Sequence, residues 1–145
     1  MIQRIENDLA DAIRAQDELR RDTLRLILTA LRSAEKDLLR PLSGDEELQV
    51  LQRERKRRVE AAEAFRAGDR PERAAREEAE LTVLEEYMPP PLSQAELEEI
   101  VDNAVAAVGA TNVRDLGRVM ADVMPQVSGR ADGSVVSQLV REALA

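Results

Sequence analysis

Apolar residues recur at intervals of three and four along nearly the whole chain, which is the spacing of one face of an α-helix. From Ile2 to about Gln16 they form one such stripe, and from Leu19 to Leu39 they cover a broader arc. We predict that the second of these helices is the hub of a bundle and packs against neighbours on two sides. Strict alternation of apolar and polar residues is brief wherever it occurs, as at Pro125–Ser128, so no strand is predicted. The pattern indicates an all-α protein of about seven helices.

Capping and helix-breaking residues divide the first part of the chain into about four helices. Asp17 marks a break after the first helix. Ser43, three residues before Glu46, fits a capping box that opens the third helix, and Gly68 should end it as a left-handed cap. Pro71 lies in the first turn of a fourth helix. The third helix is rich in cations and the fourth in glutamates, so we expect an antiparallel hairpin with opposite charges side by side.

The run of three prolines at residues 89–91 is the clearest boundary in the chain. Successive prolines cannot continue a helix, and they hold the backbone extended. We therefore predict two domains, an N-terminal helical domain at residues 1–88 and a C-terminal domain at residues 89–145.

Three helices are predicted in the C-terminal domain. Ser93 and Glu96 form a second capping box at the start of the first, which should end at Gly109. Proline is expected to stop the second helix, glycine to shape the connection, and an aspartate to cap the third. We assign these structural roles in the turn to Pro125, Gly129, Asp132 and Gly133.

The composition excludes several kinds of active site. The chain has no cysteine and no histidine, so it lacks thiol nucleophiles, Ser-His-Asp catalysis and the usual zinc ligands. It also lacks a calcium-binding loop motif and a glycine-rich phosphate loop. The carboxylates all fit helix caps, helix faces or charge pairs. We assign no catalytic residue, no cofactor and no metal ligand.

The charge and hydropathy of the whole chain restrict its partners. The formal net charge of -8 argues against unspecific coating of nucleic acid, which needs an excess of cations at the contact face. Neither a signal-peptide run nor a stretch of about 18 apolar residues is present, so we predict a soluble cytoplasmic protein with no membrane contact. The sequence assigns no oligomeric state.

A dense basic cluster occupies the middle of the third predicted helix. Its members are Arg53, Arg55, Lys56, Arg57 and Arg58. One interpretation is a solvated helix face paired with acidic neighbours such as Glu54, Glu60 and Glu63. The other is a contact with RNA or with an acidic partner. No aromatic residue lies among the cations to stack on a base, and both interpretations stay open here.

Arg130 is the main candidate for anion binding in the C-terminal domain. It stands between two glycines at the amino end of the last predicted helix, where free N–H groups and the helix dipole favour an anion. The alternative is that Asp132 caps the helix while Arg130 pairs with it or with a carbonyl. Arg114 and Arg118 are further cations if the preceding helix folds back alongside.

Three runs of residues carry a family resemblance. They are G-R-V-M-A-D-V-M-P-Q-V-S-G-R-A-D-G-S-V-V, V-L-E-E-Y-M-P-P-P-L-S-Q-A-E-L before it, and L-R-L-I-L-T-A-L-R-S-A-E-K-D in the amino-terminal part. In order and spacing they closely resemble the YqeY family. The C-terminal half is similar to the tail domain of the GatB subunit of the tRNA-dependent amidotransferase. The resemblance implies a helical bundle of about four helices, Met1 to Met88, followed by a three-helix tail-like module, Pro89 to Ala145.

The resemblance also implies a link to tRNA. In the amidotransferase the tail helps to bind tRNA, and YqeY members are commonly described with carbon–nitrogen ligase activity that uses glutamine as the amido-nitrogen donor. This chain has neither amidase nor nucleotide-binding machinery, and a tail can be inherited without the reaction. We expect a non-catalytic accessory protein that binds tRNA or associates with an amidotransferase, with partners in translation or tRNA charging. The alternative is an acidic protein-interaction adaptor with no RNA role.

The expected RNA contacts fall on two surfaces. From Leu92 onward the chain has four Arg and no Lys against eight Asp and Glu, so a contact there must be focused on a few arginines. The predicted nucleic-acid-binding residues are Arg130, Arg118 and Arg114 on the first surface and Arg55, Lys56, Arg57 and Arg58 on the second.

Overall fold

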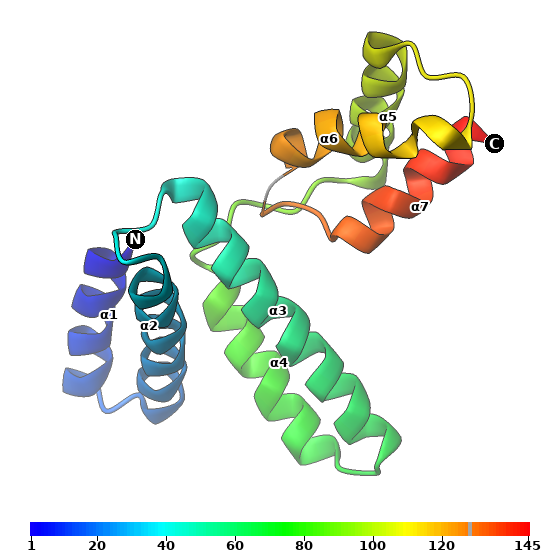
Figure 1. Ribbon diagram of the computed structural model, residues 1–145. Coiled ribbons are helices and arrows are strands. Elements are labelled where there is room, and N and C mark those ends of the chain that lie inside the picture. The colour runs from blue at the N-terminus through cyan, green and yellow to red at the C-terminus, as the bar shows by residue number, and fades with distance from the viewer. Residues whose placement is uncertain (128) are drawn as a thin grey trace. The chain divides into compact units, whose positions relative to one another are not determined.

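The computed structural model describes residues 1–127 and 129–145, and its regular structure over these residues is entirely helical (Figure 1). The α-helices are α1 Ile2–Arg14, α2 Glu18–Leu38, α3 Gly44–Ala67, α4 Pro71–Glu85, α5 Gln94–Val108, α6 Leu116–Val127 and α7 Gly133–Leu144. A short 3-10 turn, η1 Val113–Asp115, precedes α6. The prediction of an all-α protein with about seven helices is confirmed over the described part of the chain.

The contacts between helices divide the chain into two compact units, Met1–Pro89 and Pro90–Ala145. Each unit has its own cluster of buried apolar side chains, and the two clusters share no residue. The break falls within the proline run. The assignment of these parts as a bundle and a tail module stays a prediction.

Helix α2 is the hub of the N-terminal unit, as predicted. It contacts α1, α3 and α4, and its inner face carries Leu24, Ile27 and Leu31, which are fully buried. Leu26, one of the residues that broaden the apolar arc, is 51% exposed. Ala30, the other such residue, is partly buried against the core, so only part of the extra breadth faces solvent.

Helices α3 and α4 lie side by side in the N-terminal unit (Figure 1). Ion pairs join the two helices along their length: Arg55 Nε lies 3.2 Å from Glu85 Oε1, and Arg66 pairs with Glu78. Residue 55 pairs with residue 85 and residue 66 with residue 78, so the helices run antiparallel. The predicted hairpin between the basic and the acidic helix is confirmed.

The turn between α3 and α4 differs from the prediction by one residue. Gly68 has φ -86°, whereas Asp69 adopts the left-handed conformation with φ 56°. The Arg70 N–H donates to the Phe65 carbonyl at 2.7 Å and closes the turn. Aspartate tolerates this conformation better than most residues because its short polar side chain can bond locally. The prediction that Gly68 is the left-handed cap was wrong.

Helix α5 begins and ends as predicted. The Ser93 hydroxyl accepts a hydrogen bond from the Glu96 N–H at 3.1 Å, and the Glu96 carboxylate accepts one from the Ser93 N–H at 2.8 Å. Gly109 closes the helix with φ 65°. Helices α5, α6 and α7 pack pairwise around a core in which Val119 and Val136 are fully buried.

Pro125 does not end α6, which continues to Val127. Proline removes its own N–H bond to the preceding turn, and its ring crowds the carbonyl four residues earlier, but the N–H groups of the residues after it can still form helical hydrogen bonds. Val127 is fully buried four residues after Val123, which is also fully buried, so packing on one face favours the final turn. The prediction that the helix stops at Pro125 was wrong.

The two glycines of the α6–α7 connection have different roles. Gly129 has φ 72°, a left-handed conformation that disfavours a side chain. Gly133 is the first residue of α7, and a Cβ there would meet Met124 Cε at an ordinary 3.7 Å. Asp132 caps α7 by accepting a hydrogen bond from the Ser134 N–H at 2.9 Å, as predicted.

Alanine substitutions should distinguish the roles of Gly129 and Gly133 by their effects on stability. We expect Gly129→Ala to lower the free energy of unfolding by about 1 kcal/mol, because alanine is strained at positive φ. Gly133→Ala should change it by only a few tenths of a kcal/mol or raise it, since alanine favours a helix over glycine. Urea denaturation of both variants measures this difference. Equal losses would contradict the assigned roles.

Candidate nucleic-acid interface

Arg130 holds the segment that leads into α5. Its Nε donates to the Pro90 carbonyl at 3.1 Å, and its own carbonyl accepts a hydrogen bond from the Leu92 N–H at 3.0 Å. The Arg130 N–H donates to the Val127 carbonyl at 2.9 Å. These bonds match the alternative in which Arg130 pairs with a carbonyl, and they tie the proline segment to the α6–α7 connection within the C-terminal unit.

Arg118 lies at the other end of α5. Its guanidinium donates to the carbonyl of Val108, the last residue of α5, and to Asp115 Oδ1 at 3.2 Å. Arg130 binds the segment just before α5, and a helix of 15 residues is about 22 Å long. Arg118 binds at the C-terminal end of α5, beside the start of α6, whereas Arg130 follows the end of α6 and binds the segment before the N-terminal end of α5. The structure therefore does not bring Arg118 and Arg130 together.

Arg114 precedes α6 and is exposed. Its backbone N–H donates to the Asn112 side chain at 2.9 Å, and its guanidinium forms no ion pair with the described residues. It lies four residues before Arg118, near the same end of α5. The three cations predicted for the C-terminal domain therefore divide between two separate places.

Arg58 is buried, with only 5% of its side chain exposed. Its Nη1 donates to the carbonyl and to the carboxylate of Glu54, at 3.2 and 2.9 Å, and its Nε lies 3.8 Å from Glu80 Oε2. Burial raises the pKa of the Glu80 carboxyl, with a further contribution from Glu77. Arg58 thus belongs to an internal charge network. Its burial does not fit the prediction that it is one of the exposed nucleic-acid-binding residues.

The helical period explains the burial of Arg58. It lies seven residues after Leu51 and four before Ala62, both of which are buried, so the three share the inner face of α3. Arg55 is partly exposed at the seam with α4, where it pairs with Glu85. The helical spacing of Arg58 from Leu51 and Ala62 is visible in the sequence, and it could have predicted that Arg58 is buried while the adjacent cations are not.

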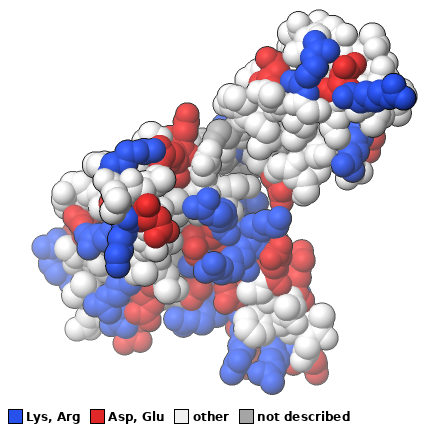
Figure 2. Space-filling view, in the orientation of Figure 1, with Lys and Arg blue, Asp and Glu red and all other residues white. Residues whose placement is uncertain are grey.

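The remaining cations of the cluster form an exposed stripe. Arg53, Lys56 and Arg57 are all exposed, and their separations of three and four residues place them on one helical face. Arg57 lies 3.6 Å from Glu54 and its side chain is 78% exposed. Arg53 and Lys56 form no ion pair with any residue that the structure describes. We call these three residues the α3 cation stripe, and Figure 2 shows Lys and Arg side chains gathered over this part of the N-terminal unit.

A groove of about 410 Å³ lies between the end of α2 and the start of α3. Its lining consists of the apolar side chains Ala34, Leu38, Leu42 and Val50, the cations Arg40 and Arg53, the carboxylates Asp37 and Glu46, and Gln49. Arg53 therefore belongs both to this α2–α3 groove and to the α3 cation stripe. Sequence reasoning missed the groove because its walls come from two helices and the loop between them.

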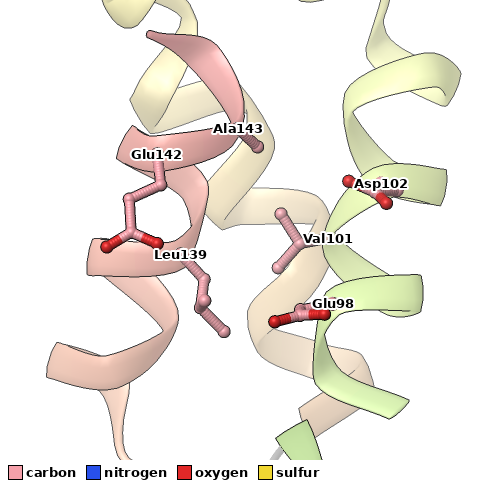
Figure 3. Close-up of a pocket in the computed structure, with 6 residues that line it drawn as sticks. All are labelled: Glu98, Val101, Asp102, Leu139, Glu142 and Ala143. Carbon is pink, nitrogen blue, oxygen red and sulfur yellow. The ribbon is translucent and has the colours of Figure 1, made fainter. Parts of the chain in front are cut away.

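The C-terminal unit has an acidic groove of about 200 Å³ between α5 and α7 (Figure 3). Glu98, Asp102 and Glu142 line it together with Val101, Leu139 and Ala143. Within the described part of the chain, none of the three carboxylates forms an ion pair. Negative charge without a nearby cation repels phosphate, so this groove is unsuited to RNA.

A model of the family described as Yqey-like protein matches residues 2–144, nearly the whole chain. The chain belongs to the YqeY family. The resemblance drawn from the sequence motifs is thereby confirmed at the level of the family.

A curated relative is similar over almost the full length of this YqeY-family chain. Altered inheritance of mitochondria protein 41, mitochondrial, from Pyrenophora tritici-repentis (strain Pt-1C-BFP), is 30% identical over 146 residues. The alignment covers 98% of this chain and 80% of the relative. The word mitochondrial belongs to that protein, and a cytoplasmic location for the present chain stays a prediction.

One polar cluster of the YqeY-family chain was not predicted. The single tyrosine, Tyr87, is buried and donates to the Asp8 carboxylate, while the Arg4 guanidinium lies 4.7 Å from the centre of its ring. Burial and the bond to Asp8 raise the pKa of the Tyr87 hydroxyl. Arg20 approaches the same hydroxyl at 3.4 Å and pairs with Glu86 at 2.8 Å. These contacts fasten the end of α4 to α1 and α2.

Two kinds of feature are absent from residues 1–127 and 129–145. No helix there is both long and apolar enough to cross a membrane. No group of three or more Asp, Glu, His or Cys side chains there is arranged to hold a metal ion.

Proposed function

We propose that this YqeY-family protein is a non-catalytic accessory protein that binds tRNA, with the α3 cation stripe as its main contact with phosphates. The observation that carries the proposal is the exposure of Arg53, Lys56 and Arg57 on one helical face, two of them without an ion pair among the described residues. Phosphate binding needs such accessible cations. The resemblance of the C-terminal half to the amidotransferase tail supports tRNA as the ligand.

The contact with RNA should be small. The net charge is -8, and the acidic α5–α7 groove is unsuited to phosphate binding. Arg118 and Arg130 bond to backbone carbonyls and Arg55 pairs with Glu85, so these three are proposed only as weaker contacts. Arg114 is exposed, but from Leu92 onward four Arg stand against eight Asp and Glu, so it too is proposed as a weaker contact. Three phosphate contacts give a slope of roughly -2 to -3 in a plot of log affinity against log salt.

A charge-reversal variant tests this proposal. Arg53→Glu, Lys56→Glu and Arg57→Glu combined should weaken the binding of bulk tRNA at least about tenfold at low salt, because the phosphate contacts are replaced by repulsion. Fluorescence anisotropy over a salt series measures both the affinity and the slope, which should become flatter. Circular dichroism checks that the variant remains helical.

The matched control changes the net charge equally at other exposed cations. Arg25→Glu, Lys36→Glu and Arg141→Glu combined should weaken binding much less, since these residues lie outside the stripe on α2 and α7. An equal loss of affinity in both triple variants would show that the effect comes from the net charge and not from the α3 cation stripe. Undiminished binding by the stripe variant, or no binding by the wild type, would refute the proposal.

An adaptor that binds a basic protein is the second candidate function. It is supported by the acidic α5–α7 groove, whose floor is apolar and whose carboxylates form no ion pair with the described residues. Pull-downs with and without RNase distinguish the candidates. Partners that survive RNase and are lost with Glu98→Gln and Glu142→Gln favour the adaptor, whereas loss of all partners on RNase treatment counts against it.

A further inference from the structure

The α2–α3 groove has the volume of a ligand site and a lining that is partly apolar and partly charged. Its volume of about 410 Å³ falls within the roughly 300–1,000 Å³ typical of small-ligand pockets. Val50 forms a buried part of the wall with 4% exposure, whereas Leu38 is 46% exposed. A flat apolar ligand in the groove would cover the exposed part of Leu38 and remove it from water.

A guanidinium is held in place at the groove. Arg40 Nη2 lies 3.0 Å from Glu46 Oε1, and its Nη1 donates to the Pro41 carbonyl at 3.1 Å. The hydrogen bond from Arg40 lowers the pKa of the Glu46 carboxyl, so the pair stays ionised at neutral pH. The Arg40 side chain is nonetheless 53% exposed. A planar guanidinium fixed in this way can stack on an unpaired base without first losing conformational freedom.

Arg53 connects the groove to the α3 cation stripe. It lines the groove and is followed on the same helical face by Lys56 and Arg57. A ligand that reaches from the groove along the stripe needs an apolar, flat group at one end and a row of negative charges beyond it. A polynucleotide strand has this chemistry, because its bases are planar and its backbone is anionic.

We propose that the α2–α3 groove receives an unstacked base of single-stranded RNA while the phosphates of the same strand lie on the α3 cation stripe. This proposal rests on the proposed function, which requires only the phosphate contacts. It adds a preference for single-stranded segments, such as the loops or the end of a tRNA. Bases stacked in a duplex cannot enter the groove, although duplex phosphates can still contact the stripe.

A substitution that leaves the charge unchanged distinguishes the contribution of the groove to RNA binding from that of the stripe. Leu38→Gln should lower the affinity of the full chain for a short labelled single-stranded RNA by about fivefold, on the scale of a weak base contact. Its affinity for the duplex of the same sequence should not change. Leu26→Gln is the matched control, because Leu26 lies on the same helix, is 51% exposed and does not line the groove. Fluorescence anisotropy measures the affinities of the wild type and of both variants for the single strand and for the duplex.

The results distinguish failure of the groove from failure of the stripe. Selective loss of single-stranded binding by Leu38→Gln, with no effect of Leu26→Gln, supports the proposal. Equal binding of single strand and duplex by the wild type, or no effect of Leu38→Gln, overturns it and leaves the proposed function intact. If the variant with three glutamates in the stripe binds both RNAs like the wild type, the proposed function fails and this proposal fails with it.

Free nucleotides provide a further arm of the same experiment. Adenosine, guanosine, cytidine and uridine monophosphates should bind far more weakly than the single-stranded RNA, because each offers one phosphate group to the stripe. A monophosphate that binds as tightly as the RNA, and equally well to the stripe variant, would overturn the assignment of a strand to the groove.

Discussion

Arg58→Ala should lower the free energy of unfolding by about 2–3 kcal/mol. Arg58 is 5% exposed, and its removal leaves the carboxylates of Glu54 and Glu80, with side-chain exposures of 13% and 11%, without their shared cation. Glu54 would keep Arg57 at 3.6 Å and Glu80 would keep Arg76 at 3.4 Å, but the side chains of these two cations are 78% and 58% exposed. The largely buried carboxylates would therefore lose the cation that is buried with them and would be only partly compensated, which costs more than the original pair contributes. Urea denaturation followed by circular dichroism measures the loss.

Arg57→Ala is the control for this prediction. Arg57 is the adjacent cation, but its side chain is 78% exposed and its distance to Glu54 is 3.6 Å, so its loss should cost less than about 0.5 kcal/mol. Equal destabilisation by the two variants would contradict the internal network. Glu80→Gln should recover part of the stability of Arg58→Ala by removing a largely buried carboxylate whose remaining ion pair is with the exposed Arg76.

The pH dependence gives a second readout of the same variant. Burial raises the pKa of Glu80 in the folded protein, so the folded state binds a proton more readily than the unfolded chain. For such a carboxyl, stability increases as pH falls through the folded pKa towards the unfolded one. Loss of Arg58 should strengthen this trend, and the stability of Arg58→Ala should therefore move closer to that of the wild type under mildly acidic conditions.

Leu84→Ala should destabilise the N-terminal unit by about 2–5 kcal/mol, the range for truncating a buried leucine. Leu84 on α4 is fully buried in the cluster that also contains Leu24 and Leu31. No residue of that cluster belongs to the core of α5–α7. We therefore expect amide hydrogen exchange to become faster in α1–α4 and to stay unchanged in α5–α7.

Val123→Ala is the reciprocal variant. Val123 is fully buried in the C-terminal core, and its truncation should accelerate exchange in α5–α7 alone. Together the two variants test the predicted division into two domains. Loss of protection throughout the chain from either substitution would show that the two units unfold as one, contrary to the prediction.

The helices and most of their ends could be predicted because the signals are local. Ser93 with Glu96, Gly109 and Asp132 act through bonds within a few residues, which the sequence displays directly. Pro125 was misjudged because burial of Val127 prolongs the helix, and packing of this kind depends on distant residues.

The candidate interface was predicted less well because its accessibility depends on tertiary contacts. Arg57 and Arg58 are neighbours in the sequence, yet α2 and α4 cover only the face that carries Arg58. Arg118 was grouped with Arg130 on the condition that its helix folds back alongside, but helix α5 separates the carbonyls that the two arginines bind. The α2–α3 groove has no local signal, since Leu38 and Val50 come from different helices.

Photo-crosslinking of tRNA to the full chain, followed by mass spectrometry of the attached peptides, tests the central claim most directly. The predicted result is that crosslinks concentrate on the part of α3 that carries Arg53, Lys56 and Arg57, and that they disappear as the salt concentration rises. Crosslinks confined to the C-terminal unit around Arg130, with α3 unlabelled, would contradict the assignment of the α3 cation stripe as the RNA-binding surface.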